Sequence, residues 1–137
     1  MAKMIHEVLQ SVGSTRKKAE KIDILKKNET VALRDVLRGI FDDRVVWTVP
    51  DGNPPYTPSE AFNCPANLLR EHLKFKYFAR TIDGNKLPKF KRERIYMGLL
   101  EGIHPSDAEI VVKMVNKEPP KGLTIEVVKE AFPDLLP

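Results

Sequence analysis

The chain has 137 residues, of which 42% are hydrophobic and 31% are charged, and its formal net charge is +4 at pH 7. This length suits one compact domain. The composition excludes a disordered chain and a membrane-embedded one, because no stretch approaches the roughly 18 apolar residues of a transmembrane helix. Charged residues such as Lys3 and Glu7 interrupt the start of the chain, which argues against a signal segment. The single cysteine, Cys64, has no disulfide partner, and we therefore expect a protein of a reducing compartment. The lack of a long apolar stretch leads us to expect no membrane partner.

Positive charge is concentrated in two segments. Residues 1–28 carry seven Lys and Arg against three Asp and Glu, and residues 66–94 carry nine against three. The segments 29–65 and 95–137 are acidic, with three positive residues against six negative ones and four against seven. A protein of net positive charge permits a polyanionic partner, and this distribution favours the two basic segments as its contacts.

Hydrophobic periodicity predicts three short helices at the start of the chain. Apolar residues recur at three- and four-residue spacings over 4–12, and Gly13 follows as a natural helix stop. Ser14 is a suitable N-cap for a second, lysine-rich helix that runs to Asn28. A third apolar stripe predicts a helix over about 29–41.

The segment 44–65 interrupts this helical pattern. The residues from Val45 to Val49 favour a strand, and a turn-rich run that contains Pro54 and Pro55 follows. An isolated strand cannot satisfy its own backbone hydrogen bonds. We therefore expect an extended packed segment or a short hairpin here, and no sheet.

Four further helices are expected after this segment, because helical spacing of apolar residues resumes. A break is expected at 83–85, where Asp, Gly and Asn follow one another. Ser106 and Glu109 form a capping box for the third of these helices, and Thr124 is a suitable N-cap for the last. The helices are predicted to begin near Leu68, Pro88, Ser106 and Thr124. The sequence thus predicts an all-α fold, a single domain of about seven short helices over 1–137.

Residues that support catalysis or metal binding are scattered along the chain. His6, His72, His104 and Cys64 stand singly, without the short spacings of a metal site. No serine lies in a nucleophile elbow, and no glycine-rich phosphate loop occurs. We therefore expect no enzymatic activity, no catalytic residue, no metal and no small-molecule cofactor.

The opening of the second predicted helix is the first candidate phosphate-binding site. A helix start combines free amide groups with the positive end of the helix dipole, which suits a phosphate. The alternative is that Ser14 only caps the helix and the lysines form a solvated face. The candidate residues at this opening are Ser14, Thr15, Arg16, Lys17 and Lys18.

The basic segment 70–94 is the second candidate. Its cations alternate with Phe75, Tyr77, Phe78 and Phe90, and such a mixture can hold phosphates and stack on bases. The helical spacing of these aromatic residues favours a place in the core instead. The candidate DNA-binding residues of this segment are Lys74, Lys76, Arg80, Lys89, Lys91 and Arg92.

Both ends of the chain carry a distinctive pattern. From Ile5 to Lys18 an apolar helix runs into Gly-Ser-Thr and a lysine-rich stretch, and from Lys121 to Pro137 a glycine precedes an aromatic-proline pair and a leucine-rich exit. In this order the two stretches resemble the N-terminal helical DNA-binding domain of T-even phage-type ATP-dependent DNA ligases. The second stretch, with the residues around Gly102, is also similar to a family of small tailed-phage proteins that resembles a free-standing version of this domain.

The resemblance implies a phage protein, in the host cell cytoplasm or in a virion, that holds DNA phosphates through helix-start amides and basic side chains. Ligases place an arginine shortly before the final glycine, whereas Pro119 and Pro120 occupy that stretch here. We do not expect ligation, because Thr81 stands where the Lys-x-Asp-Gly nucleophile would have to be. The residues that the resemblance implicates are Ser14, Thr15, Arg16, Lys17, Lys121, Gly122 and Thr124.

Two functions follow as hypotheses. The first is a non-catalytic module whose partner is double-stranded DNA, which it binds without strong sequence preference. It requires that the turns near Gly13 and Gly122 lie on one continuous surface. The second is a protein-docking subunit of a phage virion or of a replication or transcription assembly of phage or host proteins. The acidic segments and the stretch from Trp47 to Tyr56 would then form the contact surface.

Overall fold

The computed structural model describes residues 3–137, which form eight α-helices and one 3-10 helix. Within these residues no strand forms, and none of the helices is long and apolar enough to cross a membrane. The predicted all-α fold is confirmed. The helices are α1 (Ile5–Ser14), α2 (Lys18–Lys27), α3 (Val31–Phe41), α4 (Leu68–Glu71), η1 (His72–Phe78), α5 (Ile82–Asn85), α6 (Lys89–Gly102), α7 (Pro105–Val115) and α8 (Ile125–Ala131).

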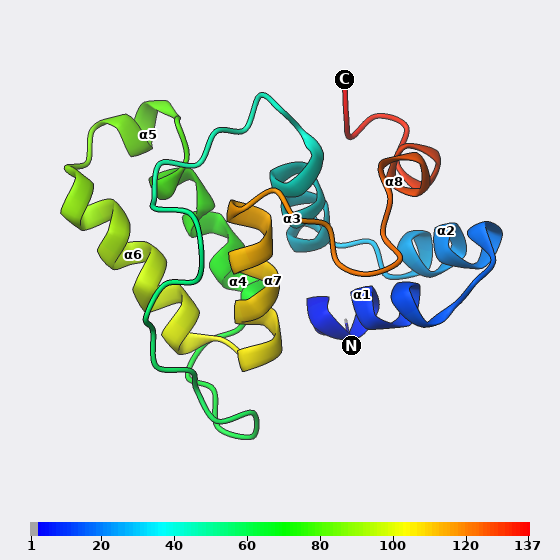
Figure 1. Ribbon diagram of the computed structural model, residues 1–137, viewed down its shortest axis with the longest axis horizontal. Coiled ribbons are helices and arrows are strands. Elements are labelled where there is room, and N and C mark those ends of the chain that lie inside the picture. The colour runs from blue at the N-terminus through cyan, green and yellow to red at the C-terminus, as the bar shows by residue number, and fades with distance from the viewer. Residues whose placement is uncertain (1–2) are drawn as a thin grey trace.

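Helix α3 lies in the middle of the molecule (Figure 1). To one side α1, α2 and α8 pack together, and to the other α6 packs on η1 and α7. One continuous core joins both sides, and it includes Leu25 of α2, Leu37 of α3, Leu100 of α6 and Met114 of α7, all fully buried. Each such side chain stabilises the fold by about 1.5–3 kcal/mol relative to an exposed one.

The segment between α3 and α4 is extended and packed, as its sequence predicts. The backbone N–H of Thr48 donates to the carbonyl of Phe78 at 2.8 Å, and the N–H of Arg80 donates to the carbonyl of Val46 at 2.8 Å. Between these bonds, the Trp47 ring packs against Phe78, with the ring centroids 5.5 Å apart. The β-prone residues therefore find backbone partners at the end of η1 without forming a sheet.

The region after Leu68 differs from the single long helix that its spacing predicts. It consists of α4, then η1, then α5. The predicted break at 83–85 is wrong, because α5 occupies these residues. The reason is a local cap that the pattern did not reveal: the Thr81 hydroxyl accepts a hydrogen bond from the Gly84 N–H at 2.9 Å.

The start of α7 also differs from its prediction. Ser106 is not the N-cap; the ring Nδ1 of His104 accepts a hydrogen bond from the Ser106 N–H at 3.0 Å instead. Pro105 is then the first helical residue, a position where its missing N–H costs nothing. The cap of α8 is as predicted, since the Thr124 hydroxyl accepts from the Val127 N–H at 3.4 Å.

Asp42 ends α3 and binds Arg44 closely. The Arg44 guanidinium donates to both carboxylate oxygens, Nε to Oδ1 at 3.1 Å and Nη2 to Oδ2 at 2.9 Å, and the Arg44 N–H also donates to Oδ1. The side chain of Asp42 is buried. These hydrogen bonds from Arg44 lower the pKa of the Asp42 carboxyl from its usual value, against the opposing effect of burial.

This interaction makes a pH prediction. Because the carboxyl pKa is lower in the folded than in the unfolded chain, Asp42 stabilises the fold above about pH 4, and the contribution is lost as the pH falls through the folded pKa. Asp42→Asn should therefore lower the free energy of unfolding near neutral pH, and the difference from wild type should shrink in acid. Urea unfolding at several pH values measures this difference, and a difference independent of pH would contradict the prediction.

Candidate nucleic-acid interface

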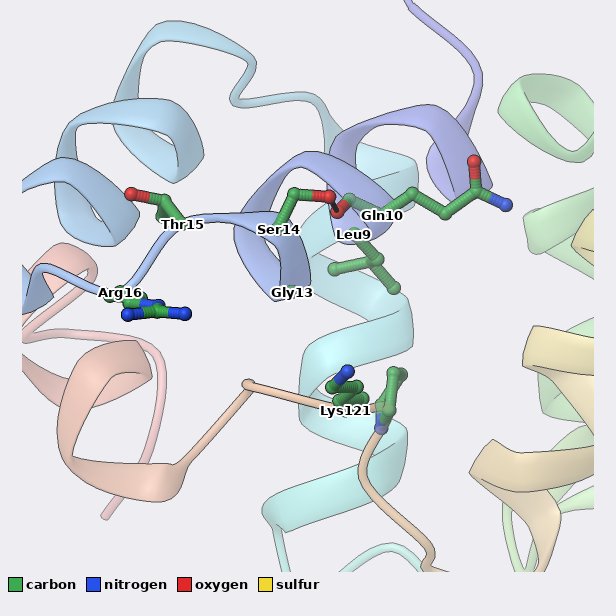
Figure 2. A pocket seen from close by; sticks show the side chains of 8 residues that line it. Leu9, Gln10, Gly13, Ser14, Thr15, Arg16 and Lys121 are labelled. Atoms are coloured by element: carbon green, nitrogen blue, oxygen red, sulfur yellow. Dashed lines mark hydrogen bonds between the residues drawn. The ribbon is translucent and has the colours of Figure 1, made fainter.

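The turn after α1 and the segment before α8 line one pocket of about 820 Å³ (Figure 2). The two turns that the DNA-binding hypothesis requires on one surface therefore lie together, although they are far apart in sequence. We call this the terminal pocket; it is lined by Leu9, Gln10, Gly13, Ser14, Thr15, Arg16, Pro120 and Lys121.

Two glycines allow the backbones to touch at this place. A Cβ atom on Gly13 would lie 2.7 Å from the carbonyl oxygen of Lys121, and one on Gly122 would lie 2.8 Å from the Cα of Gly13. Gly122 also has a φ of +81°, which an L side chain rarely adopts. The half-buried Lys21 of α2 donates from Nζ to the Gly122 carbonyl at 2.7 Å and so fixes the segment against α2.

Ser14 and Thr15 do not have the positions that the sequence predicts. Ser14 is the last residue of α1, where its hydroxyl donates to the Gln10 carbonyl at 2.8 Å, so it does not cap α2. The predicted cap is wrong because residues 15–17 are extended and α2 begins only at Lys18. The Thr15 hydroxyl donates to the carboxylate of Glu20. Both hydroxyls thus already have internal partners.

The positive charge of the terminal pocket comes from three exposed cations. Arg16 and Lys121 line the pocket, and Lys17 is the N-cap of α2. None of the three forms an ion pair with another residue of 3–137. No side chain caps α2, so its first N–H groups have no side-chain acceptor.

Three of the other predicted residues near the pocket have structural partners. Lys18 forms an ion pair with Glu130 of α8 at 2.7 Å, and both side chains are half exposed. Gly122 provides the close contact with Gly13, and Thr124 caps α8. Lys18 and Gly122 thus hold α8 and the segment before it against α2 and the end of α1, and Thr124 stabilises the start of α8.

The basic segment 70–94 lies elsewhere. Figure 1 shows the start of α6 at one end of the long axis of the molecule and the start of α2 at the other end. The fourteen predicted DNA-binding residues therefore fall into two groups, and the structure does not bring the second group to the terminal pocket. The second group belongs to η1, the α5 region and α6, and comprises Lys74, Lys76, Arg80, Lys89, Lys91 and Arg92.

The residues of this second group differ in their ion pairs and in their burial. Lys74 pairs with Glu71 at 2.6 Å, and Lys76 pairs with Asp83 at 3.4 Å. Arg92 is half-buried, and its Nε has no hydrogen-bond partner among the described residues. The exposed cations without an ion pair within 3–137 are Arg80, Lys89 and Lys91.

The aromatic residues of the basic segment also differ in their burial. Phe75 and Phe78 are buried in the core, as their spacing predicts, and Tyr77 is half-buried. Phe90 departs from the prediction, because its side chain is 62% exposed in the first turn of α6. Helical spacing in α6 places Phe90 with Glu93 and Arg94, on the face opposite the buried Leu99, so its exposure agrees with the spacing within α6.

Two histidines that stand apart in the sequence meet in the structure. The rings of His6 and His104 stack with their centroids 4.2 Å apart, and His6 Nδ1 lies 2.8 Å from Oδ1 of the buried Asp107. The His6 N–H also donates to this oxygen at 2.8 Å. Their separation in the sequence gives no sign of this contact, and residues 3–137 contain no group of three metal-binding side chains placed to hold an ion.

This cluster makes a stability prediction. Asp107→Ala removes the acceptor of the buried His6 N–H, so the free energy of unfolding should fall by about 2–3 kcal/mol. Asp107→Asn keeps one oxygen at this place and should cost less. Urea unfolding followed by circular dichroism measures both variants, and equal stability of Asp107→Ala and wild type would refute the assigned role.

These features define a small all-α protein with a cationic pocket between the turn after α1 and the segment before α8. The chain belongs to a family of unknown function (DUF6433), whose model matches residues 8–121. The matched part includes both segments that line the terminal pocket. No curated protein matches the chain.

Proposed function

We propose that this protein is a non-catalytic module that binds duplex DNA through its backbone phosphates at the terminal pocket. The observation that carries the proposal is the convergence of Arg16 and Lys121, from opposite ends of the chain, on one pocket beside the uncapped start of α2. Cations and free backbone amides together form the chemistry that holds phosphate groups.

The composition of the pocket favours binding that is independent of DNA sequence. No aromatic residue lines it, and its cations Arg16 and Lys121 suit phosphate oxygens. Contacts to phosphate fix the position of a protein on a duplex but carry no sequence information. The resemblance of both chain ends to the ligase DNA-binding domain supports the same mode of binding, while ligation itself is not proposed.

A titration of two unrelated duplexes of about 20 base pairs, each labelled with fluorescein, tests this proposal by fluorescence anisotropy. We expect saturable binding with dissociation constants that agree within about threefold. Absence of binding to both duplexes at low salt would overturn the proposal.

A protein-docking role is the second candidate, and a different observation favours it. Within the predicted contact stretch, Trp47 and Tyr56 are half-buried against the core, whereas residues 50–53 and Pro55 are exposed. Phe62 is 87% exposed, in a turn closed by the Glu60–Asn63 bridge. In a docking role Phe62 would be the side chain that anchors the contact.

Co-purification separates the two candidates. A stoichiometric protein that remains bound to the wild-type chain at high salt, and is lost with Phe62→Ala, would support docking. Nucleic acid that co-purifies at low salt and dissociates at high salt would support DNA binding.

A further inference from the structure

The first turn of α6, which lies at one end of the long axis of the molecule (Figure 1), carries an exposed phenyl between two exposed lysines. We use the name α6 surface for the exposed residues of the first two turns of α6 and of the chain on either side of α5, which are Arg80, Lys86, Lys89, Phe90, Lys91 and Arg94. All six side chains belong to exposed residues. None of its five cations forms an ion pair with another residue of 3–137, whereas the neighbouring Lys74 and Lys76 are paired.

We propose that the α6 surface binds single-stranded DNA, with the Phe90 ring stacked on an unpaired base and the surrounding cations on the flanking phosphates. The proposal does not depend on the terminal pocket, which lies at the other end of the long axis. It assigns the protein a second ligand beyond the duplex.

The position of Phe90 suits this ligand. The ring is 62% exposed, with Lys89 and Lys91 as its chain neighbours. Arg94 follows four residues later on the same face of α6, where side chains at this spacing are adjacent. An aromatic face among cations is the combination that non-specific single-strand binders use, because every base has a face to stack and every nucleotide has a phosphate.

A duplex suits this surface less well, since its bases already stack on one another and present only their edges. The terminal pocket shows the contrast, because its lining has cations and no aromatic residue. The two ends of the molecule therefore carry different chemistry for nucleic acid, one for phosphates alone and one for phosphates with an open base.

The arrangement of apolar side chains favours DNA over an anionic membrane, since positive charge attracts both. A helix that lies in a membrane interface needs a continuous apolar face. The exposed apolar side chains in this region, Phe90 and Ile82, instead belong to two different helices, α6 and α5, and Glu93 lies on the next turn of α6. Asp83 also lies nearby, but it is paired with Lys76. The net charge at this end is thus positive and suited to a polyanion.

Fluorescence anisotropy with a fluorescein-labelled oligothymidine of about 20 nucleotides, which forms no duplex, tests the proposal. We expect wild type to bind it and Phe90→Ala to weaken binding by about 5-fold to 100-fold, the loss of one stacked base. Phe90→Trp should retain binding. Because Phe90 is exposed, its replacement by alanine should leave the thermal unfolding midpoint unchanged, which confirms that the variant is folded.

Matched controls make the result specific to this surface. Phe62→Ala removes another exposed phenyl outside the surface and should not change oligothymidine binding. Phe90→Ala should leave duplex binding at the terminal pocket unchanged, so the two proposals can fail separately.

The α6 proposal is overturned if wild type does not bind oligothymidine, or if Phe90→Ala binds it as wild type does. Phe90-dependent sedimentation with phosphatidylserine vesicles, without oligothymidine binding, would assign the surface to a membrane instead.

Discussion

Replacement of Arg16 and Lys121 by glutamate in one variant should reduce duplex affinity by at least about 100-fold. Both residues line the terminal pocket and neither has an ion pair within 3–137, so the substitutions change the charge presented to phosphate by four units. Each side chain is exposed, and the fold should therefore tolerate the change. Anisotropy titration of a labelled duplex measures the loss.

A variant with the same change in net charge provides the control. Lys26 and Lys129 are exposed, have no ion pair within 3–137 and do not line the pocket. Lys26→Glu with Lys129→Glu should weaken duplex binding far less than Arg16→Glu with Lys121→Glu. Equal losses in the two variants would mean that total charge governs binding, and the terminal pocket would have no special role.

The affinity for duplex DNA should also fall steeply with salt. If the three unpaired cations Arg16, Lys17 and Lys121 each contact one phosphate, the plot of log affinity against log salt should have a slope of about −3. Affinity should then fall about 50-fold between about 50 and 200 mM salt.

The charge-reversal variant provides a second test by the same salt titration. Because Arg16→Glu with Lys121→Glu removes two phosphate contacts, its residual binding should have a slope shallower by about two. A flat salt response of wild type would be incompatible with phosphate contacts, whatever the affinity.

Much of the fold follows from local sequence patterns. Apolar periodicity predicts α1, α3, α6, α7 and α8, because each buries one face against the core. The N-cap of α8 is visible as Thr124 ahead of an apolar stripe. The extended segment before α4 is also predictable, since its β-prone residues precede a proline-rich turn.

Other features depend on contacts between distant residues and could not be read from the sequence. The 3-10 geometry of η1 occurs where His72 Nδ1 lies 2.6 Å from Oδ2 of Asp35 on α3 and where Phe75 packs on Trp47. His104 as the cap of α7 likewise depends on a side chain that stacks on His6. Local patterns carry no information about such partners.

The candidate site was predictable in composition and only partly in geometry. Arg16, Lys17 and Lys121 stand out as cations beside glycine turns, and the structure places them around one pocket. Ser14 misleads, because a serine after glycine is typical of an N-cap, yet its hydroxyl bonds back into α1. The exposure of Phe90 follows from helical spacing, which places it opposite the buried Leu99 on α6.

Backbone amide chemical shifts, recorded on the isotope-labelled protein as a short duplex is added, test the DNA-binding account most directly. We expect the largest changes together in 13–18 and in 121–122, the two segments that meet at the terminal pocket. Changes confined to other parts of the molecule, or to one of these two segments, would contradict a shared phosphate-binding site.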